Sequence, residues 1–286
     1  MLTQSLYAQY SPWTDRSGTL SWFRLGLFLL LLLPGASIAT SLIVGEVGPE
    51  PFEHQIHETG EWAVRVLLLS LFITPLRRIF KWNRVIGVRR MIGVAGFSYA
   101  FAHLVLYMAQ EHWDLAKVAS EIIKRFYLSV GFVSVAMLAV LALTSFDSMI
   151  RRLGHRWGRI HTLVYPAVAL GLFHFFLQSK SDVFQPTIMA GLFSLLMLYR
   201  LTARAGFKQL PWWSLAVCAL LGVGLTALIE YAWYALATGI PADRVFAANF
   251  QVFSGGNMRP AIIVGLFGGV LALAALLGRI VTRFRA

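Results

Sequence analysis

Long apolar stretches separated by short polar segments make up most of the chain. Eight stretches are expected to be transmembrane helices, at residues 21–43, 61–79, 91–110, 126–146, 161–178, 186–203, 212–238 and 260–279. Each approaches the roughly 20 residues that a helix needs to cross the hydrocarbon core of a bilayer. The first follows a polar N-terminal segment and is long enough to span, so we interpret it as a helix and not as a secretion signal. The pattern predicts an all-α integral membrane protein, a bundle of about eight transmembrane helices.

Composition supports this class. Hydrophobic residues make up 58% of the 286 positions and charged residues only 13%, whereas about a quarter of the residues of a soluble domain are charged. The single cysteine, Cys218, excludes a disulfide framework and a zinc site built from several thiolates.

The net charge of +12 is distributed as a membrane topology requires, which argues against nucleic acid as a partner. Lys and Arg concentrate in alternate connecting segments, and the segment GEVGPEPFEHQIHETGE between the first two stretches is acidic. The positive-inside rule then predicts cytoplasmic N- and C-termini, with basic loops facing anionic lipid. One loop, RRIFKWNRVIGVRR, is unusually basic and contains Arg77, Arg78, Arg89 and Arg90. It either serves topology alone or helps to seat an anionic electron donor or a phosphate-bearing cofactor.

Two histidines are expected at matched depth in the membrane. His103 follows the cytoplasmic start of its helix by 12 residues, about 18 Å, and His174 follows His161 by 13 residues, about 20 Å. Two imidazoles at one depth can hold a heme iron from opposite sides. The alternative is that each is a hydrogen-bonded packing residue.

His161 is harder to place. In a straight helix it would point about 140° away from His174, although Pro166 between them could kink the helix. It would then lie at the cytoplasmic boundary, where it either ligates a second heme or contacts a heme propionate or a flavin. We expect His54, His112 and His155 to be surface residues, and the aromatic runs FHFF and WYALA to be packing residues.

Residues 59–205 resemble the heme-binding membrane subunits of periplasmic methionine-sulfoxide reductase systems (MsrQ, also called YedZ), within the ferric-reductase-like transmembrane group. The matching stretches are TGEWAVRVLLLSLFITPLRR, VRRMIGVAGFSYAFAHLVLY and RRLGHRWGRIHTLVYPAVALGLFH.

The resemblance implies that His103, His161 and His174 are heme ligands, with one b-type heme or two, and with flavin mononucleotide (FMN) as an additional cofactor. It implies an electron-transfer subunit of the bacterial inner membrane, not a self-contained enzyme. The donor would be a cytoplasmic flavin reductase or quinol, and the acceptor a periplasmic molybdenum-containing reductase that repairs methionine sulfoxide.

The chain departs from the family in its length, because two further apolar stretches follow residue 205. We therefore divide it into residues 1–60 (N-terminal segment, first helix and acidic outer loop), 61–205 (heme-binding core) and 206–286 (C-terminal extension). The extension leaves two alternatives open. One is ferric-reductase-like electron transfer to another acceptor, and the other is a non-redox transporter or anchoring subunit whose histidines line a polar path.

Overall fold

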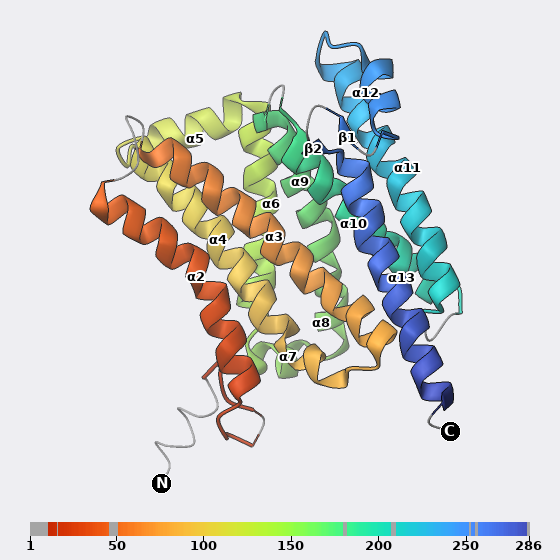
Figure 1. The fold of residues 1–286 in the computed structure, drawn as a ribbon. Coiled ribbons are helices and arrows are strands. Elements are labelled where there is room, and N and C mark those ends of the chain that lie inside the picture. The colour runs from red at the N-terminus through yellow and green to blue at the C-terminus, as the bar shows by residue number, and fades with distance from the viewer. Residues whose placement is uncertain are drawn as a thin grey trace. The chain divides into compact units, whose positions relative to one another are not determined.

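The chain folds almost entirely into helices (Figure 1). The computed structural model describes residues 11–15, 17–45, 51–179, 182–206, 210–251, 253–254 and 257–284. The long helices are α2 (Trp22–Val44), α3 (Pro51–Phe80), α4 (Arg89–Gln110), α6 (Phe126–Leu143), α9 (Val164–Ser179), α10 (Phe184–Arg204), α11 (Trp212–Ala237) and α13 (Pro260–Phe284). Shorter elements connect them: η1 (Asn83–Val88), α5 (Leu115–Lys124), α7 (Asp147–Leu153), α8 (His155–Ile160), η2 (His161–Leu163) and α12 (Ala242–Ala248). The two-residue strands β1 (Phe253–Ser254) and β2 (Asn257–Met258) pair in antiparallel fashion.

The predicted membrane architecture is confirmed. Within the described ranges, seven helical segments are long and apolar enough to cross a membrane, and they coincide with seven of the eight expected spans. The one expected span that is not among these seven, residues 61–79, lies inside α3, whose middle is largely buried.

Two local expectations were wrong, for residues 51–60 and for the fifth span, and one connection contains an additional helix. Residues 51–60 are not a loop but the first turns of α3, where Pro51 takes a position that needs no backbone N–H donor. The connection after α4 contains the helix α5, whose N-cap Asp114 accepts a hydrogen bond from the backbone N–H of Lys117.

The fifth span is not one continuous α-helix, because a 3₁₀ turn at His161–Leu163 separates α8 from α9. Pro166 therefore lies in the first turn of α9 and not at a kink in its middle.

The helices fall into two compact units, which are described separately. Unit 1 comprises Met1–Ser70 and Gly87–Ala167, and unit 2 comprises Leu71–Ile86 and Val168–Ala286. The long helices α3 and α9 each contribute one part to either unit.

In unit 1, α4 packs against α2 and α6, and a tyrosine joins α2 to α4. The Tyr99 hydroxyl donates to the carbonyl of Leu31 at 2.7 Å and accepts from the backbone N–H of Gly35 at 2.9 Å. Those two backbone groups would bond to each other in an uninterrupted helix. The hydroxyl is thus inserted into the hydrogen-bond ladder of α2, next to Pro34, which has no N–H to donate.

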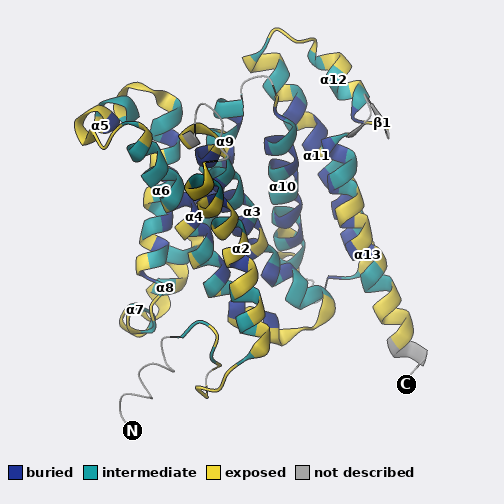
Figure 2. Ribbon diagram, turned by 60° about the vertical axis from the view of Figure 1, so that its left-hand side comes forward, coloured by how far each residue is buried: buried dark blue, intermediate teal, exposed yellow. Residues whose placement is uncertain are grey.

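In unit 2, α10, α11 and α13 pack against one another. A Cβ at Gly268 of α13 would lie 2.7 Å from the Cβ of Ala219 on α11, so the small residue is needed for this close approach. The opposite face of α13 exposes Leu266, Val270, Leu273 and Leu277 (Figure 2). Such an apolar stripe is what a helix presents to lipid tails.

Candidate functional site

His103 lies on α4 in unit 1, half-buried, with a defined partner on α3. Its Nδ1 is 2.7 Å from the carbonyl oxygen of Ile56. Since a carbonyl oxygen can only accept, Nδ1 carries the proton in this hydrogen bond. The proton is then absent from Nε2 in the neutral ring, and Nε2 keeps a lone pair with which to bind a metal. Histidines that bind metals usually donate their other ring N–H in this way.

Gly60, one turn after Ile56 on α3, is what allows the His103 ring to approach. A Cβ at Gly60 would lie 3.0 Å from Nδ1 and 3.2 Å from Cε1 of His103. Those distances are shorter than an ordinary carbon contact. The imidazole is therefore seated on the backbone of α3, at a position where α3 has no side chain.

His161 lies in a different environment, at the corner between α6, α8 and η2 of unit 1. Its ring stacks on the Trp157 ring with the centroids 4.0 Å apart. Nδ1 is 3.2 Å from the carbonyl oxygen of Trp157, and Nε2 is 3.4 Å from the hydroxyl of Ser145. The Trp157 indole N–H donates to the carbonyl of Thr144 at 2.9 Å. Both ring nitrogens of His161 thus face protein groups.

The same corner holds one of the four candidate arginines. Arg90 forms an ion pair with Asp147 and donates a second hydrogen bond to the carbonyl of Ser145. Ser145 therefore connects Arg90 to His161. We call Arg90, Ser145, Asp147, Trp157 and His161 the polar corner.

The other arginines are distributed between the units. Arg89 is half-buried at the start of α4 in unit 1. Arg77 and Arg78 are half-buried in the last turn of α3, in the part that belongs to unit 2. The structure thus brings Arg90 and His161 into one cluster, and the gathering of all four arginines at one site stays a prediction.

His174 lies on α9, in the part that belongs to unit 2, and is half-buried. Phe176, two residues later, is 5% exposed and packs with Val183 and Ala190 against partly buried side chains of α11. The remaining predicted surface histidines His54, His112 and His155 are exposed, as expected, and so is His57. In the described ranges, no three side chains of His, Cys, Asp or Glu gather as a metal cluster, but a heme needs only one protein ligand on each face.

Sequence reasoning missed the groups that surround the histidines. Ile56 contributes only its carbonyl, which no sequence pattern reports. Gly60 stands in the TG tract of the resemblance, but its closeness to His103 requires the packing of α3 on α4. Trp157 could have been found, because it precedes His161 by four residues and so lies on the same helical face.

Comparison with known proteins agrees with the architecture. Residues 59–172 match the family described as the ferric reductase like transmembrane component. No solved structure matches the chain significantly.

Several curated proteins are similar over more than half of the chain. A protein-methionine-sulfoxide reductase heme-binding subunit MsrQ from Rhodospirillum rubrum is 38% identical over 180 residues, which is 62% of this chain and 86% of that protein. MsrQ from Herminiimonas arsenicoxydans is 36% identical, over 61% of this chain and 82% of its own length. MsrQ from Xanthomonas euvesicatoria is 40% identical, over 57% of this chain and 75% of its own. With seven apolar helices and relatives of this similarity and coverage, the chain belongs to the MsrQ family of heme-binding subunits.

Proposed function

We propose that this multi-pass bacterial inner-membrane protein is the heme-binding, electron-transfer subunit of a protein-methionine-sulfoxide reductase system. The observation that carries the proposal is the hydrogen bond from Nδ1 of His103 to the Ile56 carbonyl. It fixes the tautomer in which Nε2 can bind iron. The names of the relatives support heme as the ligand.

The proposed axial ligands of a b-type heme are His103 on α4 and His174 on α9. The heme, when bound, supplies one-electron transfer, and the chain supplies the ligands and an apolar setting that keeps water away. We assign this role to the core at residues 61–205, and treat residues 206–286 as an extension of it. No proton-transferring side chain is required for electron transfer, so the chain is a conducting subunit that depends on a partner for the chemistry on the substrate.

The polar corner is the proposed electron-entry side. Arg90 is already paired with Asp147, so Arg89 of the same unit is the better candidate there to meet an anionic donor such as the phosphate of FMN. Arg77 and Arg78 stay candidates on the evidence of the sequence alone. His161 would then serve the corner through Ser145, or ligate a second heme. A cytoplasmic flavin reductase or a quinol would be the donor, and a periplasmic molybdenum-containing methionine-sulfoxide reductase the acceptor. This direction requires cytoplasmic N- and C-termini.

The test is a spectrum followed by an electron-transfer assay. The purified protein should show the Soret and α bands of low-spin b-type heme. Its reduced heme should be reoxidised when a purified catalytic subunit of the reductase and methionine sulfoxide are added together. Reduction by an anionic flavin donor should slow as salt is raised and after charge reversal at Arg77 and Arg78. Absence of heme from the purified protein would favour the transporter or anchoring alternative.

A substitution at Gly60 tests the seating of His103. Gly60→Val should displace the imidazole, because the new side chain would occupy the space of Nδ1 and Cε1. Disturbing the group that orients a metal ligand typically costs about 10–100-fold in metal affinity. We therefore expect loss of low-spin heme, measured by the pyridine hemochrome assay and by electron paramagnetic resonance.

The matched control for this variant is Gly26→Val on α2, where nothing lies within 4 Å of the added Cβ. Equal heme content and equal spectra in the Gly60 and Gly26 variants would contradict the proposed seating.

A further inference from the structure

We propose that the C-terminal extension fixes the rotation of α9, the helix that carries His174. Trp233 is the residue of the extension that positions α9. This inference rests on the proposed function, because it concerns the geometry of an expected heme ligand. All the residues that carry it belong to unit 2. It assigns a role to two helices that lie outside the matched family segment at residues 59–172.

The contact between the extension and α9 is aromatic. Trp233 of α11 lies against Phe176 of α9, with the ring centroids 5.2 Å apart. Ile229 and Tyr234, also on α11, pack on the same buried cluster, to which the α10 region contributes Val183 and Ala190. Aromatic pairs at this distance contribute attraction beyond the area they bury.

The geometry of α9 connects this contact to His174. Phe176 follows His174 by two residues, so its side chain points about 200° around the helix from the imidazole and lies about 3 Å further along. Trp233 thus presses on the face of α9 opposite to His174. The contact of Trp233 with Phe176 fixes the rotation of α9 about its axis. That rotation sets the direction in which the imidazole of His174 points.

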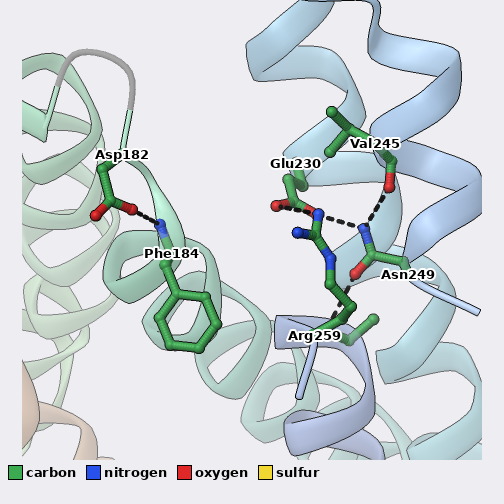
Figure 3. A network of polar contacts seen from close by, with 7 residues as sticks. Asp182, Phe184, Glu230, Val245, Asn249 and Arg259 are labelled. Carbon is green, nitrogen blue, oxygen red and sulfur yellow. Dashed lines mark hydrogen bonds and ion pairs between the residues drawn. The ribbon is translucent and has the colours of Figure 1, made fainter. Parts of the chain in front are cut away.

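A buried polar network holds α11 at the same turn. The Glu230 carboxylate, 3% exposed, pairs with the guanidinium of Arg259 through contacts of 3.0 and 3.1 Å (Figure 3). Asn249, fully buried after α12, donates to the same carboxylate and to the carbonyl of Val245, and accepts from the backbone N–H of Ala261 at 3.4 Å. These bonds tie α11 to α12 and to the start of α13.

Glu230 precedes Trp233 by three residues, less than one helical turn. The turn of α11 that contacts α9 is therefore also the turn that the network anchors. The buried network and the ring contact with Phe176 thus act on the same turn of α11.

The experiment compares heme retention in a graded series at Trp233. Trp233→Phe, Trp233→Leu and Trp233→Ala remove increasing parts of the ring contact. We expect heme transfer to apomyoglobin to accelerate along the series, reaching about tenfold in Trp233→Ala. The g-values of the low-spin heme and its midpoint potential should shift in the same order, because the imidazole direction changes.

The matched control is Leu215→Ala, a fully buried residue of the same helix about 27 Å away along α11. It should lower thermal stability without changing the heme spectrum or potential. If Leu215→Ala shifts the heme properties as much as Trp233→Ala does, the effect is general loosening and the inference falls. If the whole Trp233 series behaves like the parent, it falls as well.

His174→Ala separates this inference from the function on which it rests. Unchanged low-spin heme in His174→Ala removes the ligand assignment itself. Loss of low-spin heme in His174→Ala together with a parent-like Trp233 series contradicts only the proposal that the extension positions α9. If Trp233→Ala does not accumulate in the membrane, the order of the Phe and Leu variants decides.

Discussion

Purified His103→Ala and His174→Ala proteins are expected to lack the low-spin heme bands of the parent protein. Each substitution removes one of the two proposed axial ligands, and a five-coordinate heme is high-spin and less firmly held. Loss of a group that only orients a ligand already costs about 10–100-fold in metal affinity, so loss of the ligand itself should cost at least as much. The measurement is the heme-to-protein ratio together with the Soret and α bands of the reduced protein.

Two exposed histidines provide controls, since His54→Ala and His155→Ala remove imidazoles from the surface. These proteins should keep the parent spectrum. Parent-like low-spin heme in both the His103 and His174 variants would eliminate the proposed pair. The ratio in His161→Ala answers a further question: a fall from two hemes to one assigns His161 to a second heme, whereas an unchanged ratio leaves it to the polar corner.

Arg259→Ala is expected to be the most destabilising single substitution in the extension. It leaves the carboxylate of Glu230 buried without its cation, and breaking a buried ion pair from one side typically costs about 3–5 kcal/mol. That loss corresponds to a fall of roughly 10 °C in the apparent melting temperature of the solubilised protein. Differential scanning fluorimetry in detergent measures it.

Arg244→Ala is the control for the loss of an arginine, because Arg244 is exposed on the neighbouring α12. A double variant, Glu230→Leu with Arg259→Met, should recover much of the loss, since replacing a whole buried ion pair by apolar groups is often close to neutral. If the Arg259→Ala and Arg244→Ala proteins have the same melting temperature, the network of Glu230, Asn249 and Arg259 contributes little to stability.

The helices were predictable because a bilayer demands long apolar runs, and α2, α6, α11 and α13 satisfy that demand without ambiguity. The prediction was wrong for a polar segment between two of the apolar runs. Residues 51–60 are acidic and contain His54 and His57, so they were expected in a loop, yet they continue α3 because Gln55, Ile56 and Thr59 are buried. Hydropathy alone does not report that a polar turn has a packing partner.

The candidate site was predictable only at the level of residue type. His103 could be named from its depth and from the resemblance, but its partner is a main-chain carbonyl, which every residue has. The estimate that His161 points about 140° away from His174 assumed one continuous helix. The 3₁₀ turn at His161–Leu163 contradicts that assumption. The Glu230–Arg259 pair joins residues 29 positions apart, and no local pattern connects them.

The hydroxyl of Tyr99 inside the ladder of α2 has a consequence for the order of assembly. Because α2 precedes α4 along the chain, it can enter the membrane before Tyr99 does, and lipid offers no partner to an open backbone bond. Until then, Leu31 and Gly35 can satisfy each other across one helical turn. Only when α4 arrives is that bond exchanged for the two bonds to Tyr99. In that order of insertion, α2 reaches the hydrogen-bond pattern of the folded protein only after α4 has packed against it.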